Sequence, residues 1–316
     1  MKDYDPELIF NKGKRGKIGF STPKTDCPDI QMESIIDSSL LRKSVCSLPE
    51  ISEPEIVRHF TNLSVKNHHI DKGFYPLGSC TMKYNPKIND MIAGMDNFKN
   101  IHPLQDPSKS QGCLEVLFNL ESILNSITGM HSTTLQPSAG SQGEFAGILV
   151  MSKYHESKGN SKNNIIIPES AHGTNPASVV LGGYTPVKVG TNSRGRVDIE
   201  DLKSKVDDDT VGMMLTQPNT LGLFEDEIET ISQIIHDVDG LMYMDGANLN
   251  ALLGISKPFD MGFDITHINL HKTFSTPHGG GGPGAGPICV VEKLSDFLPI
   301  PRVVKNDDKF ELSYDH

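Results

Sequence analysis

The feature that most constrains the fold is a regular alternation of short apolar runs and amphipathic helical segments across residues 131–292. The runs are "HSTTLQ", "NIIIP", "TPVKVG", "VGMMLTQ", "LMYMD", "DITHINL" and "PICVVE", and helical segments such as "GEFAGILVMSKYHES" and "EDEIETISQIIHDV" lie between the earlier ones. Apolar strands that alternate with helices are typical of parallel strands joined by crossover helices. We therefore predict an α/β fold, with a mostly parallel sheet covered by helices on both faces.

The chain before this alternation is interrupted by prolines and carries only short helical stretches. The segment "SEPEIVRHFTNLS" predicts a helix that Ser52 caps, with Glu55 in its first turn. A longer helix is predicted within "LQDPSKSQGCLEVLFNLESILNSITGM", where leucines recur every three or four residues, and it ends at Gly129. We expect residues 1–110 to form an N-terminal arm with short helices and residues 111–295 to form the large α/β domain.

Charge and composition argue against several classes of protein. The formal net charge is −11 and no dense Lys/Arg stripe is present, so we expect no nucleic-acid partner. No apolar run approaches the ~20 residues of a membrane span, and "MKDYDPELIF" lacks the apolar core of a signal peptide, so we expect a cytoplasmic protein without membrane contact. The five cysteines form no C-x-x-C pair, which argues against a metal cluster and favours a reducing compartment.

The residues that end each apolar run are the candidates for a site, because ligands of such sheets bind outside the carboxyl ends of the strands. Asp245 ends "LMYMD", and a buried carboxylate there needs a cationic or hydrogen-bonding partner. Taken alone, an Asp that caps the next segment is the simpler interpretation. Lys272 ends the following run, where a lysine can bind phosphate, neutralise a carboxylate or form a Schiff base.

Together these two residues narrow the choice of chemistry. A pyridoxal phosphate enzyme needs a lysine for the aldimine, an acid beside the pyridinium nitrogen, an aromatic face over the ring and donors for the phosphate. Lys272 and Asp245 supply the first two, and His172 in "ESAHGTNP" could supply the face. The N–H groups of a helix that begins in "PSAGSQGE" could hold the phosphate, whereas both nucleotide motifs, G-x-x-x-x-G-K-[ST] and G-x-G-x-x-G, are absent.

The motifs at these strand ends resemble one known family, the P-proteins of the glycine cleavage system, also called glycine dehydrogenases (decarboxylating). The resemblance runs in order from Gly13 to the last residues and is closest to subunit 2 of the two-subunit form. It is carried by "DKGFYPLGSCTMKYNPKIN", "QPSAGSQGE", "ESAHGTNPAS", "TQPNTLGLFE", "MDGANLN" and "NLHKTFSTPHGGGGPGAGP".

The resemblance implies a fold-type I pyridoxal phosphate enzyme and gives the motifs their roles. Lys272 would form the internal aldimine, Asp245 would keep the pyridinium nitrogen protonated, and His172 would stack on the ring. The positions implied for the phosphate and for the surroundings of the ring are Ser138, Ala139, Gly140, Asn248 and His271.

The same resemblance implies the reaction. Glycine would displace Lys272, lose its carboxylate as carbon dioxide, and leave a carbanion that the ring stabilises. The aminomethyl group would then pass to the lipoyl arm of the H-protein. Cys80 and His102 are implied to line the glycine pocket or the lipoyl channel, although a buried structural thiol is an equally good interpretation of Cys80.

Partners and missing parts are implied as well. Subunit 2 of this family pairs with a homologous subunit 1, usually in a heterotetramer with two of each. It also continues into a smaller C-terminal domain, so we expect residues 296–316 to be only the start of that domain. Two alternatives stay open: another fold-type I enzyme, such as an aminotransferase or a lyase, or a chain that is inactive alone.

Overall fold

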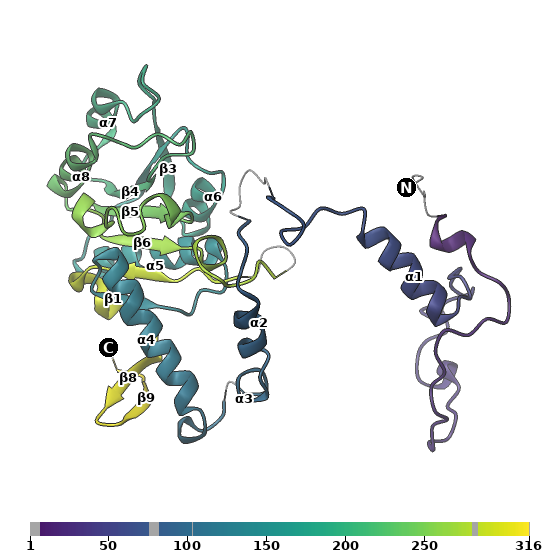
Figure 1. Ribbon diagram of the computed structural model, residues 1–316. Coiled ribbons are helices and arrows are strands. Elements are labelled where there is room, and N and C mark those ends of the chain that lie inside the picture. Colours follow the sequence, from purple (N-terminus) through teal and green to yellow (C-terminus); the bar gives the residue numbers. More distant parts are fainter. Residues whose placement is uncertain (1–6, 76–81, 103, 280–283, 316) are drawn as a thin grey trace. The chain divides into compact units, whose positions relative to one another are not determined.

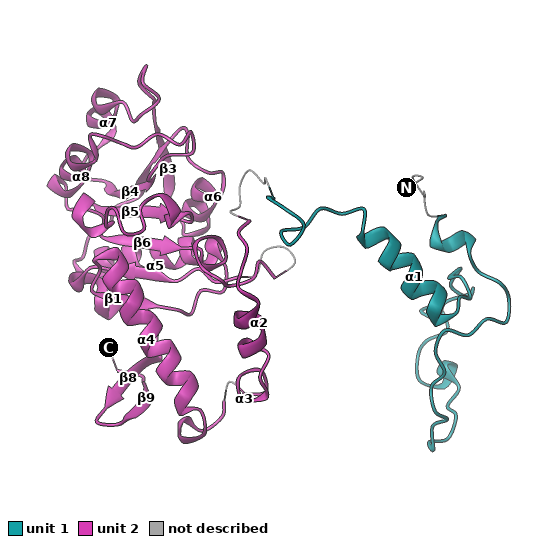
Figure 2. Cartoon of the chain, viewed as in Figure 1, with its two compact units in different colours: residues 1–75 teal, residues 76–316 magenta. Residues whose placement is uncertain are grey.

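The structure is a computed structural model that describes residues 7–75, 82–102, 104–279 and 284–315 of the chain (Figure 1). It divides into two compact units, Met1–Tyr75 and Pro76–His316 (Figure 2). Among the described residues, no helix has both the length and the apolarity needed to cross a bilayer.

The first unit contains helix α1 (Glu53–Ser64) and two short 3-10 helices, Ile9–Asn11 and Met32–Ser34. The predicted helix start is confirmed, because Ser52 and Glu55 form a capping box at the N-terminus of α1. The Ser52 backbone N–H donates to Glu55 Oε2 at 3.1 Å, which satisfies a donor that the helix itself leaves unpaired.

The second unit contains a seven-stranded sheet in the order β1-β7-β6-β5-β4-β2-β3. Every apolar run of the alternating region forms one of its strands: β1 (Ser132–Thr134), β2 (Asn164–Pro168), β3 (Thr185–Val189), β4 (Thr210–Thr216), β5 (Leu241–Gly246), β6 (Ile265–Ile268) and β7 (Ile288–Val290). Strands β2 to β6 pair in parallel, so the predicted α/β fold is confirmed. Strand β7 runs antiparallel to both β6 and β1, and the one helix that the described residues hold between β6 and β7 is the four-residue α9, which is too short for a parallel crossover.

Helices cover both faces of this sheet. The helices of the second unit are α2 (Lys87–Ala93), α3 (Asp96–Lys99), α4 (Gln111–Thr128), α5 (Gly140–Ser157), α6 (Thr174–Leu181), α7 (Ile199–Lys205), α8 (Ile228–Asp237) and α9 (Leu270–Thr273). One core layer joins the sheet to α4, α7 and α8, and the other joins it to α5 and α6. The predicted end of α4 is confirmed, with Gly129 left-handed at φ 76°.

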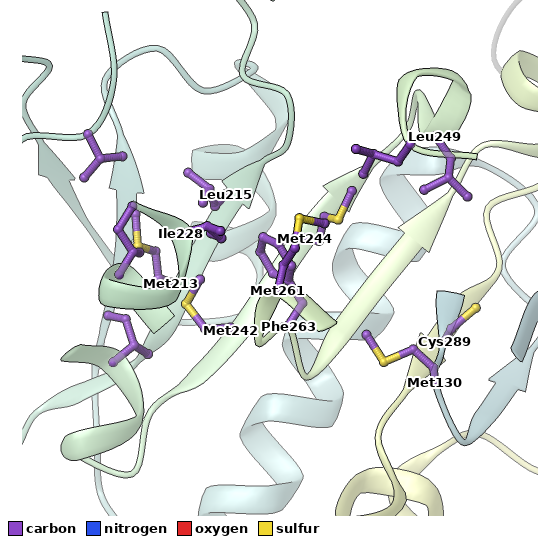
Figure 3. Packing of buried hydrophobic residues seen from close by; sticks show 14 of the residues in the cluster. Met130, Met213, Leu215, Ile228, Met242, Met244, Leu249, Met261, Phe263 and Cys289 are labelled. Carbon is purple, nitrogen blue, oxygen red and sulfur yellow. The ribbon is translucent and has the colours of Figure 1, made fainter. Parts of the chain in front are cut away.

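Side chains along β5 alternate between the two layers, as the pleat of a strand requires. Met242 and Met244 lie in the layer with α8, which is rich in methionine, as Figure 3 shows. Leu241 and Tyr243 lie in the layer with α5. All four side chains are fully buried, so β5 is apolar on both faces, as is typical of a central parallel strand.

Helix α5 approaches the sheet closely because glycines face it. A Cβ built on Gly143 would lie 2.5 Å from the Gly286 carbonyl oxygen and 3.2 Å from His267 Cβ. One built on Gly147 would lie 2.2 Å from Cε2 of Tyr243, whose ring is fully buried. The glycines at these positions therefore set the distance between the helix and the strands beneath it.

Replacing Gly147 by alanine is expected to lower the free energy of unfolding by about 1–3 kcal/mol, because the added methyl group overpacks a buried ring. Gly112 on α4 is the matched control, since a Cβ there would meet nothing within 4 Å. Alanine at that position should stabilise the helix by about 0.5–1 kcal/mol. Urea unfolding of both variants measures the difference, and equal effects would contradict the packing argument.

Residues after the sheet form a two-stranded hairpin of β8 (Arg302–Asn306) and β9 (Lys309–Ser313). It is held to the start of α4 by Gln111, whose Nε2 donates to the Phe310 carbonyl at 2.7 Å and whose Oε1 accepts from the Phe310 N–H at 2.9 Å. The hairpin therefore packs on the large unit.

Candidate active site

A cavity of about 760 Å³ opens at the carboxyl ends of the parallel strands. It is bounded by the residues that follow β2, β4, β5 and β6 and by the first turn of α5. Seven residues that the sequence singled out line it: Ala139, Gly140, His172, Asp245, Asn248, His271 and Lys272. The residues chosen by the rule that ligands bind beyond the strand ends thus lie around one cavity.

Asp245 is the buried acid of this cavity, with 5% of its surface exposed. Its Oδ2 accepts from Asn175 Nδ2 at 3.0 Å and its Oδ1 accepts from the Ala247 N–H at 3.1 Å. Burial works to raise the pKa of Asp245, but His267, these two hydrogen bonds and the charge of Lys272 together lower the pKa below its ordinary value. Asp245 is therefore a carboxylate that stays charged although it is removed from water.

His172 and Asp245 are linked through a second buried acid, Glu144 on α5. Thr174 Oγ1 lies 2.7 Å from His172 Nδ1 and donates to Glu144 Oε1 at 2.7 Å. Glu144 Oε2 accepts from Asn175 Nδ2 at 3.2 Å, and this same amide donates to Asp245. One continuous network thus fixes the histidine on one side of the cavity and the acid on the other.

The first turn of α5 forms one end of the cavity. Ala139, Gly140 and Ser141 line it, and the N–H groups of a first helical turn have no partner within the helix. A Cβ on Gly140 would lie 2.5 Å from Asn269 Oδ1, so only glycine permits this approach of helix and strand end. The helix dipole and these N–H groups favour a phosphate.

Lys272 lies in α9, the single turn of helix that follows β6, next to the buried His271. Burial, and then the charges of His278 and Lys272, lower the pKa of His271. Its Nδ1 accepts from the Ala285 N–H at 3.3 Å, which fixes the ring beside the lysine. Neutral His271 adds no further positive charge beside Lys272 at neutral pH.

Two unpaired polar atoms indicate that this cavity binds a ligand. Thr216 Oγ1 and Asn269 Oδ1 are buried and have no hydrogen-bond partner in the part of the chain that the structure describes, and both residues line the cavity. Buried polar groups in folded proteins are nearly always paired, so each is expected to meet a group that is not protein. The residues present fit pyridoxal phosphate, which offers a phosphate, a ring nitrogen and a phenolic oxygen. The described residues contain no group of three or more His, Cys, Asp or Glu that could hold a metal.

Two other predicted site residues, Ser138 and His102, do not line the cavity. The Ser138 side chain is exposed, and both its N–H and its hydroxyl donate to Gln142 Oε1 at 2.8 Å. Ser141, three residues further on, lines the cavity instead. His102 lies in an exposed loop and accepts from the Leu104 N–H at 3.0 Å. Cys80 lies outside the described residues.

Residues that the sequence interpretation missed complete the site. Glu144, Thr174, Thr216, Asn219 and Asn269 line the cavity, and none was assigned a role. A signal for Glu144 was available, because a charged residue on the buried face of an otherwise apolar helix requires partners. The others are polar residues at strand ends, where sequence alone does not separate a side chain in the site from one in a turn.

Sequence comparison identifies relatives of the whole chain. Residues 26–309 match the family model of the glycine cleavage system P-protein. The probable glycine dehydrogenase (decarboxylating) subunit 2 of Chloroherpeton thalassium is 53% identical over 97% of this chain and 62% of its own length. The protein of the same name from Bacillus cytotoxicus is 50% identical over 100% of this chain and 64% of its own length. The chain thus spans less than two thirds of these relatives.

Solved structures show the same fold. A crystal structure of glycine decarboxylase (P-protein) of the glycine cleavage system, in an inhibitor-bound form, matches with a TM-score of 0.72 at 19% identity, over 90% of this chain and 64% of that one. A sphingosine-1-phosphate lyase of Burkholderia pseudomallei matches with a TM-score of 0.55 at 16% identity, over 89% and 67%. The fold is that of fold-type I pyridoxal phosphate enzymes. By its match over most of its length, the chain belongs to the glycine cleavage system P-protein family, and its relatives there are of the subunit 2 type.

Proposed function

We propose that this chain is the cofactor-bearing subunit of a glycine decarboxylase, which uses pyridoxal phosphate to remove the carboxylate of glycine and passes the aminomethyl group to the lipoyl arm of an H-protein. The observation that carries the proposal is the meeting of Lys272, Asp245 and His172 in one cavity. They come from the ends of three different strands, and nothing in chain connectivity requires them to lie together.

Each of these groups has a task that its surroundings support. The amine of Lys272 would hold the cofactor, and the charged, buried Asp245 would keep a proton on the ring nitrogen. His172 would form a wall against the ring face, and the first turn of α5 would hold the phosphate. When bound, the cofactor supplies an electron sink for the charge that develops as carbon dioxide leaves. Exclusion of water from such a site would favour loss of the carboxylate.

The proposal includes partners. The name subunit 2 of the relatives implies a subunit 1, and we propose a heterotetramer with two copies of each. A lipoylated H-protein would deliver the acceptor of the aminomethyl group. The net charge of −11 favours neither nucleic acid nor an anionic membrane surface as a partner.

The first experiment is a visible absorption spectrum of the purified chain with pyridoxal phosphate, before and after borohydride, followed by peptide mapping. We expect a yellow complex that borohydride fixes on Lys272. Attachment to a different lysine would contradict the assignment of the site. If no colour develops with the chain alone, the same experiment is repeated with subunit 1 added, and failure there would contradict the proposed function.

The reaction is tested separately from the cofactor. Glycine-dependent exchange of labelled carbon dioxide, with subunit 1 and H-protein present, is expected for a glycine decarboxylase. An aminotransferase would instead convert the bound cofactor to its amine form when an amino donor is added, without exchange. That outcome would retain the site and overturn the reaction.

A further inference from the structure

A row of three buried side chains runs from the core to the cavity through neighbouring strands. The Tyr243 hydroxyl on β5 lies 2.7 Å from His267 Nδ1 on β6, and His267 Nε2 lies 3.5 Å from Asp245 Oδ1 at the end of β5. Tyr243 and His267 are 0% exposed, and their rings are stacked with centroids 5.9 Å apart. Neither residue lines the cavity, so Asp245 alone connects this row with the site.

The positions of the protons assign a donor and an acceptor to each contact in the row. His267 Nε2 is buried without a hydrogen-bond partner among the described residues, and the Asp245 carboxylate lies 3.5 Å from it. A carboxylate attracts an N–H and repels a lone pair, so the proton of the imidazole is favoured on Nε2. In the tautomer with its single N–H on Nε2, the imidazole accepts at Nδ1 from the Tyr243 hydroxyl, which lies 2.7 Å away. Burial, together with the charges of Glu144 and Asp245, raises the pKa of Tyr243, so its hydroxyl keeps the proton that it donates.

Helix α5 holds the row from the other side. A Cβ on Gly147 would lie 2.2 Å from the Tyr243 ring, and one on Gly143 would lie 3.2 Å from His267 Cβ. The Tyr243 ring and the His267 Cβ therefore pack directly against the glycine face of α5. The orientation of His267 is therefore set by packing as well as by its hydrogen bond to Tyr243.

We propose that Tyr243 and His267 are positioning residues for Asp245: the tyrosine fixes the tautomer of the histidine, and the histidine presents its N–H to the hidden oxygen of the carboxylate. Asp245 thereby keeps its charge and its orientation toward the cavity. The part of this proposal that concerns the ring nitrogen of a cofactor rests on the proposed function. The part that concerns the tautomer does not.

The tautomer is tested on the chain without any cofactor. Nitrogen NMR of protein labelled with ¹⁵N-histidine, with His267→Asn used to assign the signals, reports which ring nitrogen carries the proton. We expect a protonated Nε2 and an unprotonated Nδ1. An unprotonated Nε2, or two protonated nitrogens, would overturn the proposal whether or not the chain binds pyridoxal phosphate.

The effect on the site is tested with a pair of ligands. Pyridoxal phosphate and its 1-deaza analogue differ in the ring nitrogen alone, so the ratio of their affinities measures what Asp245 contributes. In Tyr243→Phe and His267→Asn this ratio is expected to fall by roughly threefold to tenfold, because the first removes the hydrogen bond that fixes the tautomer and the second removes the N–H that faces Asp245. General damage to the fold lowers both affinities and leaves the ratio unchanged, and that result would overturn the positioning role.

Two matched controls lie in the same core. Tyr154→Phe removes a tyrosine hydroxyl that donates to Asp239 at 3.1 Å, and His155→Asn removes a buried ring whose Nε2 lies 2.9 Å from the Val211 carbonyl oxygen. Both residues lie outside the row and outside the cavity. The ratio of affinities should match that of the unchanged chain in each, and a fall of the same size would also count against the proposal.

Discussion

Replacing Lys272 by alanine is expected to abolish the covalent attachment of pyridoxal phosphate and to leave the fold intact. Lys272 lies in a single helical turn at the edge of the cavity, and its side chain contributes nothing to either core layer. Without the amine, the carbon dioxide exchange rate should fall by roughly 10³-fold or more, as it does when other enzymes lose their nucleophile. The measurements are the visible spectrum, borohydride labelling and the exchange assay with subunit 1 and H-protein.

Lys83 provides the control for this variant. Its Nζ donates to the His271 carbonyl at 2.8 Å, and burial lowers its pKa, so it is a second amine near the site that could react with an aldehyde. Lys83→Ala is expected to keep the cofactor attached to Lys272. Loss of attachment in Lys83→Ala, and its survival in Lys272→Ala, would show that the site uses the other lysine.

Replacing Asp245 by asparagine is expected to retain the cofactor and to reduce the exchange rate by roughly 10²- to 10³-fold. Asparagine is neutral, so it cannot hold a proton on the ring nitrogen by its charge, and the ring becomes a weaker electron sink. Asn175 and Ala247 each donate a hydrogen bond to one carboxylate oxygen. One of them would face an amide NH₂ in the variant, and stability should fall by about 1–3 kcal/mol for that reason alone.

Asp264→Asn is the control that separates the loss of exchange activity from the loss of stability. Asp264 is also buried, and its carboxylate accepts from His236 Nε2 and from Lys293 Nζ at 2.7 and 2.8 Å, away from the cavity. Its replacement should lower stability and leave exchange per folded molecule unchanged. Full exchange activity in Asp245→Asn would refute the role proposed for Asp245.

The centre of the sheet was predictable from sequence because its central strands, such as β4 and β5, are apolar on both faces. A run such as "LMYMD" has no polar residues at alternate positions before its final Asp, so neither face of the strand suits the surface. Turn residues bound it on both sides. The direction of β7 was not predictable in the same way. "PICVVE" is as apolar as the parallel strands, and its antiparallel direction depends on the path of the chain between Lys272 and Ile288, which carries no periodic pattern.

The site was predictable where a residue type and a strand end coincide. Asp245, Lys272 and His172 each follow an apolar run, and the strand-end rule places them together. Their supports were not predictable. Tyr243 and His267 look like ordinary core residues of two strands, and only the register between β5 and β6, which pairs Asp245 with His267, reveals that they line up. Ser138 and Ser141 differ by one helical turn, which is finer than a sequence pattern resolves.

The glycines of α5 also link the packing of this helix on the sheet with the dimensions of the cavity. The helix that offers its first N–H groups to the cavity is the helix whose glycines rest on Tyr243 and on the strand that carries His267. The spacing between that helix and the sheet therefore fixes the distance between the first turn of α5, where we propose that the phosphate binds, and Asp245. A methyl group added at Gly143 or Gly147 would lengthen this distance, and weaker binding of the cofactor should be measurable in molecules that are still fully folded.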